Sequence, residues 1–216
     1  MYLVKTPWLL KRLYPAYTWH LPSAEKVLYL TFDDGPHETA TPFALDELKT
    51  YNAKATFFCI GKNVVKYPVI YKRILEEKHA IGNHTYHHLN GWKTDDEVYV
   101  NDINEASQHI ESLLFRPPYG KIKKYQYKKM NQDAALHSPF SIIMWDVLSG
   151  DFDITITPQK CLDNVIKNAD NGSVIVFHDS TKAWSRMSYA LPEVLRYFSN
   201  KGFTFKAIKN NFQPAT

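Results

Sequence analysis

The regular alternation of apolar runs with amphipathic stretches is the feature that most constrains the fold of this chain. Seven apolar runs predict strands at 26–32, 53–60, 80–84, 113–120, 140–147, 173–180 and 203–208. Helical patterns lie between most of them, at 41–51, 64–78, 94–113, 158–169 and 184–199. Continuous apolar strands that alternate with helices are typical of a parallel sheet covered by helices. About seven parallel strands in 216 residues predict an α/β fold, a distorted (β/α) barrel smaller than the eightfold one.

The length and the N-terminal composition suggest how the chain is divided. A chain of 216 residues suits one large domain, and we assign residues 26–216 to it. Residues 1–25 combine Trp, Tyr and basic side chains with prolines at 7, 15 and 22, which interrupt any long helix. We therefore expect an arm packed on the barrel, with peripheral contact to a membrane surface as the alternative.

The charge and hydropathy of the sequence do not identify a binding partner. The net charge of +4 is mild, and nothing else in the sequence indicates a nucleic-acid partner. The lysine-rich segment 121–129 is interpreted as a solvated helix face. The sequence contains no apolar stretch long enough for a transmembrane segment and no recognisable signal peptide. On that basis we expect a cytoplasmic or peripheral location.

Polar side chains gather where the predicted strands end. Five of the apolar runs, those that end near residues 32, 83, 115, 145 and 177, are each followed by polar side chains. These side chains are Asp33, Asp34, His84, Arg116, Asp146, Asp151, His178 and Asp179. The carboxyl ends of parallel barrel strands meet on one face, where active sites of such barrels are built. The pattern therefore predicts an active site at the C-terminal ends of the strands.

The segment HTYHH at 84–88 supplies a candidate metal centre. His84 and His88 are four residues apart, so in a helical turn both imidazoles project from one face and can bind the same ion. With Asp34 they form a set of two imidazoles and one carboxylate, which leaves positions open for water and substrate. The same ligand set occurs in hydrolytic metal sites and in non-haem iron oxygenases, so it does not choose between the two reactions.

Two further residues favour hydrolysis. Cleavage of an amide needs a base that deprotonates water and an acid that protonates the departing amine. Asp33, next to Asp34, can be the base, and His178 can be the acid. An oxygenase has no evident use for this pair together with Arg116.

Five ordered segments carry a family resemblance. TFDDGP, HTYHH, RPPYG, WDVLSGDF and VIVFHD resemble the motifs of the polysaccharide deacetylases, which are carbohydrate esterase family 4 or the nodulation-factor-deacetylase homology domain. The resemblance covers residues 27 to 208 and implies a distorted (β/α) barrel, with residues 26–216 as the catalytic domain. It also implies metal-dependent removal of acetyl groups from an acetylated glycan.

The resemblance implies a role for each site residue. Asp33 would be the base, oriented by Arg116, and His178 would be the acid, with its pKa raised by Asp151. The backbone N–H of Tyr119 would help to stabilise the oxyanion. The divalent ion would be held by Asp34, His84 and His88. The walls of the acetyl pocket would be Trp145, Phe152 and Val176.

The sequence departs from the family pattern at two pocket positions and leaves the substrate open. Phe152 stands where Trp is common, and Val176 where Leu is common. Removal of N-acetyl groups from N-acetylglucosamine-type residues, as in chitooligosaccharides or peptidoglycan, is the leading hypothesis. An O-acetyl esterase on xylan or another glycan is the first alternative, and a non-catalytic glycan-binding protein is the second. Zinc suits the ligand set, and cobalt and nickel compete there.

Overall fold

The computed structural model describes residues 2–131 and 140–209, and its strands form one parallel sheet of eight. The strands are β1 (Val27–Asp33), β2 (Thr56–Cys59), β3 (Ala80–Asn83), β4 (Leu114–Phe115), β5 (Ser141–Ile142), β6 (Val147–Leu148), β7 (Val174–His178) and β8 (Thr204–Phe205). Their order is β5-β4-β3-β2-β1-β7-β6, with β8 paired to the start of β1. All of these pairings are parallel, which confirms the predicted α/β class and the distorted barrel.

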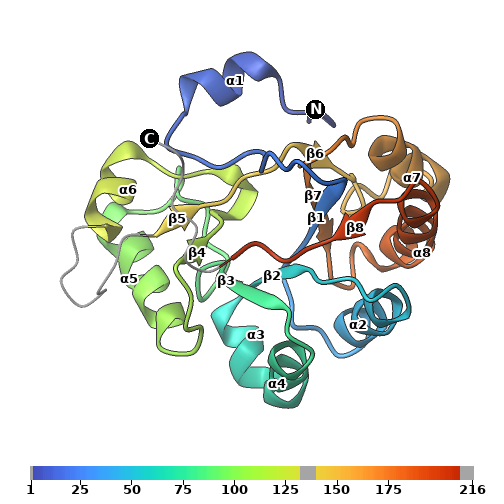
Figure 1. Cartoon of the computed structure of the whole chain (residues 1–216). Coiled ribbons are helices and arrows are strands. Elements are labelled where there is room, and N and C mark those ends of the chain that lie inside the picture. The colour runs from blue at the N-terminus through green and yellow to red at the C-terminus, as the bar shows by residue number, and fades with distance from the viewer. Residues whose placement is uncertain (1, 132–139, 210–216) are drawn as a thin grey trace.

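The helices lie outside the curled sheet, as Figure 1 shows. They are α1 (Trp8–Leu13), α2 (Ala40–Thr50), α3 (Gly61–Lys66), α4 (Pro68–Glu76), α5 (Asp96–Ser107), α6 (Lys124–Met130), α7 (Pro158–Ile166) and α8 (Trp184–Asn200). Inside the largest core cluster, Phe32 of β1 stacks on Phe57 of β2 and on Phe177 of β7, with ring centroids 4.9 and 6.1 Å apart. Aromatic packing of this kind fixes the central strands, whose ends carry the polar residues.

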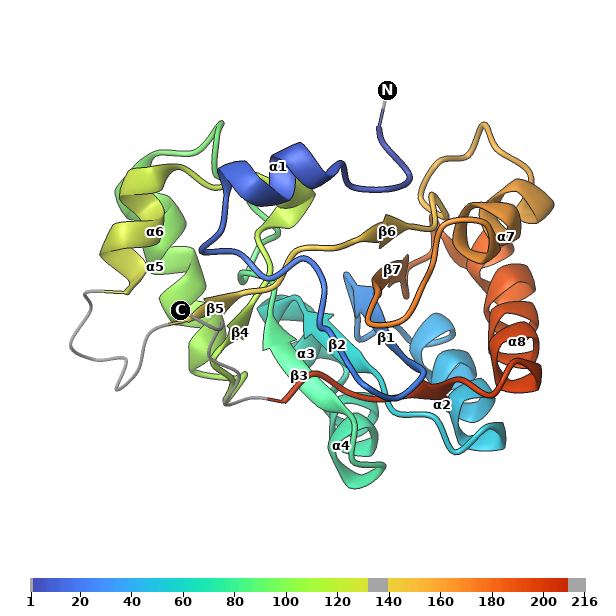
Figure 2. The ribbon, with the colours of Figure 1, turned by 45° about the horizontal axis from the view of Figure 1, so that its top comes forward.

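The segment 2–20 runs beside the chain that joins β5 to β6 (Figure 2). Backbone bonds link Thr18 N–H to Ile142 O, Met144 N–H to Thr18 O and Thr6 N–H to Asp146 O. β5 and β6 are the two edge strands of the curled sheet, and the N-terminal segment bonds to the chain between them. These bonds satisfy backbone groups at the seam that the sheet itself leaves unpaired. The short helix α1 lies above this seam in both views.

Four predicted elements differ from the structure. The strand predicted at 113–120 is only β4, because prolines 117 and 118 lack the N–H groups of a strand ladder and residues 118–120 form a 3-10 helix. The helix predicted at 64–78 is two helices, because Pro68 disfavours helical backbone at the preceding Tyr67, which has φ −124° and ψ 57°. The strand predicted at 140–147 is divided into β5 and β6, because residues between them bond to the N-terminal segment instead.

The helix predicted to begin at Thr94 begins at Asp96. Its N-cap is Asp95, whose carboxylate accepts from the N–H groups of Glu97 and Val98. The Thr94 hydroxyl donates instead to the carbonyl of Asn90. Among the described residues, no helix combines the length and the apolar character needed to cross a bilayer.

Candidate active site

A pocket opens at the C-terminal ends of the strands, with a volume of about 420 Å³. Its lining includes Asp33 and Asp34 from the end of β1 and His178 from the end of β7. His84 and His88, which follow β3, line it from the neighbouring side. We call this the catalytic pocket. Its volume lies within the range of small-molecule sites in proteins.

Three side chains converge in the catalytic pocket, but the helical turn expected at 84–88 is absent, because positive φ at Thr85 and His88 makes this segment an irregular bend. Nε2 of His88 lies 3.2 Å from Oδ1 of Asp34, and Nε2 of His84 lies 3.8 Å from the same oxygen. One ligand atom from each residue lies within 4.8 Å of the others. The Asp34 and His88 backbones both have positive φ, 82° and 62°. Non-glycine residues in this region are strained, and such strain concentrates at functional sites.

The donor atoms fit a divalent ion. Within the described part of the chain, Asp34 Oδ1 is buried without a well-oriented hydrogen bond. Nδ1 of His84 bonds the Arg116 carbonyl at 2.7 Å, so Nε2 is left to face the pocket. Burial lowers the pKa of His84 to about 4, which keeps the imidazole neutral, the form that binds metal.

The charge of Asp34 also suits a metal ligand. Burial by itself would raise its pKa, but the contact with His88 and the nearby His178 and His84 outweigh burial and hold the pKa below its usual range. The carboxylate is therefore ionised at neutral pH. An ionised carboxylate and a neutral imidazole form a set that zinc and other first-row divalent ions accept.

Asp33 is held by a buried arginine. Nη1 of Arg116 donates to Asp33 Oδ1 at 2.7 Å and to the Thr31 hydroxyl at 2.7 Å. The guanidinium is fully buried, and it also donates to the carbonyls of Ile143 and Met144. Because every branch of Arg116 has a partner, its charge and its orientation are fixed. Asp33 therefore keeps one oxygen toward Arg116 and can present the other to the pocket.

His178 is held by a buried aspartate. Nδ1 of His178 donates to Asp151 Oδ1 at 2.7 Å, and the His178 N–H donates to Asp151 Oδ2 at 2.6 Å. Burial by itself would lower the pKa of His178, but the Asp151 carboxylate outweighs it and raises the pKa to about 10. The imidazole is therefore protonated at neutral pH and can give up a proton from Nε2.

The residues predicted as substrate contacts all line the catalytic pocket. They are Tyr119, Trp145, Phe152 and Val176. The Phe152 ring lies 5.2 Å from the His178 ring, and the Tyr119 ring lies 4.8 Å from the His88 ring. Tyr119 has φ 60°, a further strained position at the rim. The structure thus places these four side chains around the predicted metal ligands.

Sequence reasoning missed several residues of the site. Tyr2, Leu148, Ser180 and Lys182 also line the catalytic pocket. The ring of Tyr2 packs on that of Phe152, with centroids 5.0 Å apart. No motif indicated Tyr2, because it belongs to the N-terminal segment, far in the sequence from the other pocket residues. Ser180 and Lys182 follow His178 closely in the chain, and that proximity was the available signal.

Asp146, which follows a predicted strand, lies outside the catalytic pocket. It is fully buried, and its carboxylate accepts from Lys5, Lys11 and Ser173, with His20 Nδ1 at 3.4 Å. Three of these partners belong to the N-terminal segment. Asp146 is therefore an anchor for that segment rather than a contact of the catalytic side chains.

An aspartate held by an arginine, a histidine held by an aspartate and three candidate metal ligands surround one cavity, an arrangement that suits a hydrolytic site on a (β/α) barrel. The family model described as polysaccharide deacetylase matches residues 20–135. A peptidoglycan-N-acetylglucosamine deacetylase of Bacillus cereus is 35% identical, over 88% of this chain and 90% of that relative. The chain belongs to the polysaccharide deacetylase family, carbohydrate esterase family 4, and is a polysaccharide deacetylase.

Solved structures of polysaccharide deacetylases superpose on this chain. A peptidoglycan N-acetylglucosamine deacetylase in complex with 4-naphthalen-1-yl-N-oxidanyl-benzamide superposes with a TM-score of 0.84 at 34% identity. The superposition covers 97% of this chain and 98% of that one. The Xyl-CE4 domain of a multidomain xylanase from the hindgut metagenome of Trinervitermes trinervoides has a TM-score of 0.77 at 28% identity, covering 89% and 94%.

Proposed function

We propose that this enzyme removes the N-acetyl group from N-acetylglucosamine-type residues of a peptidoglycan-like glycan. The observation that carries the proposal is a pair of neighbouring groups in the catalytic pocket: Asp33, which Arg116 fixes, and His178, which Asp151 keeps protonated. The likeness to relatives named as peptidoglycan deacetylases supports the substrate class. The roles of the individual residues are part of the proposal.

Asp34, His84 and His88 would hold the divalent ion, and zinc is the ion we propose. When bound, such an ion supplies acidification of water and polarisation of the acetyl carbonyl. The strained turn at Tyr119 would direct its backbone N–H toward the carbonyl oxygen, whose charge grows during the reaction. Trp145, Phe152 and Val176 would enclose the methyl group and exclude bulk water.

Asp33 and His178 would move the protons. Asp33 accepts a proton from the attacking water while Arg116 keeps its carboxylate oriented. His178 gives its Nε2 proton to the amine nitrogen as the C–N bond breaks, and Asp151 stabilises the imidazolium before that transfer. An amine leaves far more readily when it is protonated. The acid therefore matters more for an amide than for an ester with a good leaving group.

Acetate release from a panel of substrates tests the proposed function. The zinc-loaded protein is given N-acetylglucosamine oligomers, peptidoglycan fragments and acetylated xylan at equal acetyl concentrations. We expect the highest kcat/KM on the N-acetylated substrates. The likeness to the xylanase domain makes xylan the matched alternative, and faster release from xylan would overturn the assignment to N-deacetylation.

A further inference from the structure

The short helix α1 presents an apolar face that the rest of the described chain does not cover. Trp8 is 71% exposed, Leu9 53% and Leu13 64%, and α1 contains no buried residue. Each residue turns a helix by about 100°, so positions 8, 9, 12 and 13 lie within about 140° of one another. Together Trp8, Leu9, Arg12 and Leu13 form one surface, which we call the α1 face.

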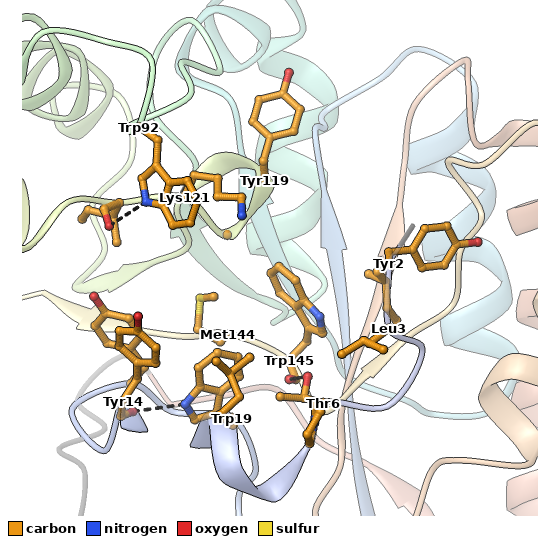
Figure 3. A pocket seen from close by; sticks show the side chains of 16 residues that line it. Tyr2, Leu3, Thr6, Tyr14, Trp19, Trp92, Tyr119, Lys121, Met144 and Trp145 are labelled. Carbon is orange, nitrogen blue, oxygen red and sulfur yellow. Dashed lines mark hydrogen bonds between the residues drawn. The ribbon is translucent and has the colours of Figure 1, made fainter. Parts of the chain in front are cut away.

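The α1 face points away from the cavities of the barrel. Tyr14 and Trp19 line an aromatic cavity of about 290 Å³ beside the catalytic pocket (Figure 3), and no side chain of the α1 face does so in the described part of the chain. Lys11 forms a salt bridge with the buried Asp146 and so ties α1 to the barrel. The exposed side chains are therefore carried on a helix that is already fixed, and a partner loses little affinity to ordering it.

The charge of the N-terminal segment has one sign. Residues 1–24 contain Lys5, Lys11 and Arg12 and no Asp or Glu. Lys5 and Lys11 pair with the barrel, whereas Arg12 is exposed and forms no salt bridge with any described residue. The α1 face thus combines three apolar side chains with one cation that is free to meet an anionic partner.

Helix α6 adds a second basic surface beside this segment. Its Tyr127 packs against Tyr17, which follows α1, with ring centroids 5.9 Å apart. Lys124, Tyr125 and Lys128 are exposed and lie on one side of α6, at positions i, i+1 and i+4. Neither Lys124 nor Lys128 forms a salt bridge within residues 2–131 and 140–209. The positive charge of α1 is therefore reinforced by its surroundings.

We propose that the α1 face binds the surface of an anionic lipid bilayer. Trp and Leu side chains of a short amphipathic helix enter the headgroup region, and anionic lipids attract the Lys and Arg side chains beside them. The size of the α1 face favours lipid over protein, because a stable protein interface needs about 800 Å² on each partner and three side chains cannot supply it. The inference is independent of the proposed function, since lipid binding involves none of the residues of the catalytic pocket.

Co-sedimentation with vesicles tests the proposal. The vesicles contain either equal parts of phosphatidylglycerol and phosphatidylcholine or phosphatidylcholine alone. We expect binding to the anionic vesicles, weakened about tenfold by Trp8→Ala and by Leu13→Ala, because each variant loses an apolar side chain that the bilayer would bury. Val69→Ala is the matched control and should bind normally: Val69 is 80% exposed, and its helix α4 lies on the side opposite α1 in Figures 1 and 2. Melting temperatures check the fold.

A charge variant tests the electrostatic part of the proposal. Arg12→Gln should weaken binding to the anionic vesicles about fivefold and leave binding to phosphatidylcholine unchanged. Lys49→Gln is the control, because Lys49 is an exposed residue of α2, away from α1 in both views. Added salt should weaken binding of the unchanged protein to the anionic vesicles, since it screens exposed charges.

Brominated lipids locate the contact. Bromine quenches the fluorescence of a tryptophan that enters the bilayer, so the bound protein should lose emission. Trp8→Phe should still bind the anionic vesicles, because the Phe ring remains apolar, but most of the quenching should disappear. Quenching that persists in Trp8→Phe would place the contact elsewhere and overturn the proposal.

The remaining outcomes are distinct. No binding to anionic vesicles overturns the proposal, and so does equal binding by Trp8→Ala, Leu13→Ala and the unchanged protein, or an equal loss in Val69→Ala. A dimer in sedimentation that Leu13→Ala dissociates would make the α1 face a contact between two copies and would also overturn it. Vesicle binding that depends on Trp8 in a protein that releases no acetate supports this inference and contradicts only the proposed function.

Discussion

The catalytic pocket and the aromatic cavity beside it, which we call the arm groove, share part of their lining but are built in different ways. In the catalytic pocket, each of the two proposed proton-transfer groups forms an ion pair with a buried partner: Asp33 with Arg116, and His178 with Asp151. In the arm groove, aromatic side chains such as Trp92 stand largely in solvent on segments far apart in the sequence. Buried ion pairs set protonation and geometry, whereas exposed rings supply contact area.

The difference indicates which substitutions should affect the proposed proton transfers and which should leave them intact. A change in the catalytic pocket should alter the rate on every substrate, because all of them use the same proton transfers. A change in the arm groove should leave these proton transfers intact, because none of the proposed proton-transfer groups lines it. Variants of the two regions therefore differ in the kind of effect as well as its size.

Loss of a metal ligand should give the largest effect. His84→Ala removes one of the three proposed ligands, so we expect zinc affinity to fall at least about 100-fold and acetate release at least about 1000-fold. His109→Ala is the control, since His109 is exposed and belongs to none of the candidate metal clusters among the described residues. Zinc titration with a competing chelator measures the affinity. Equal zinc binding by the two variants would contradict the assignment of ligands.

His178→Asn should distinguish amide from ester chemistry. We expect acetate release from the N-acetylglucosamine pentamer to fall about 1000-fold, because the departing amine loses its acid. Release from 4-nitrophenyl acetate, whose leaving group needs no proton, should fall about tenfold or less. Both kcat/KM values are measured at pH 7 at matched zinc content. Equal losses on the two substrates would contradict the role of His178 as the acid.

Asp146→Asn should weaken the folded state without touching the catalytic pocket. The Asp146 carboxylate is fully buried against Lys5 and Lys11, so its loss should lower the free energy of unfolding by about 2–4 kcal/mol at pH 7. Asp170→Asn is the control: Asp170 is mostly exposed and forms one 3.4 Å pair with Lys5, so we expect a loss below about 1 kcal/mol. Urea unfolding measures both.

The effect of Asp146→Asn should depend on pH with a definite sign. Burial by itself would raise the pKa of Asp146, but its hydrogen bonds to His20, Lys11, Lys5 and Ser173 lower it below the usual range. Because the pKa of Asp146 is lower in the folded state, its ionised carboxylate stabilises the fold at pH values above its unfolded pKa of about 4. This stabilisation is lost progressively as the pH falls from there toward the folded pKa. The deficit of Asp146→Asn should therefore shrink between pH 7 and pH 3. A deficit that stays constant would contradict this account.

Phe152→Trp should give the smallest effect, on the choice of acyl group. Phe152 lies between the rings of Tyr2 and His178, so the larger indole should narrow the space for the acyl chain. We expect kcat/KM for N-acetyl substrates to change by no more than about threefold and that for N-propionyl analogues to fall about tenfold. An unchanged acetyl-to-propionyl ratio would mean that Phe152 does not enclose the acyl group.

The sequence was most informative where strand ends carry polar side chains. Asp33 and His178 end neighbouring paired strands, so alternating apolar runs were enough to predict that they meet. The course of the N-terminal segment could not be predicted, because it depends on long-range bonds such as Lys5 to Asp146 that leave no local pattern. Asp146 was grouped with the strand-end residues of the site, because its partners in the N-terminal segment could not be predicted either. The division of the chain at residue 25 and the roles of the site residues stay predictions.

Local backbone restrictions and hydrogen bonds explain why some predicted elements were wrong. Pro68 divides a helix that hydrophobic periodicity alone predicts as continuous. The helix predicted from Thr94 begins later, at Asp96, because the Asp95 carboxylate accepts from two N–H groups of its first turn. The strand at 140–147 divides because its middle residues bond to Thr18 and Thr6. In each case a hydrogen bond or a backbone restriction outweighed the apolar pattern.

Acetate release by the Asp33→Asn variant tests the central claim most directly. The amide oxygen of the introduced asparagine can still accept from Arg116, so the fold and the zinc content should match those of the unchanged protein. With the N-acetylglucosamine pentamer at pH 7, we expect kcat to fall at least about 1000-fold while pentamer affinity is retained. A variant that holds zinc, binds the pentamer and releases acetate at the original rate would contradict the assignment of Asp33 as the base of a deacetylase.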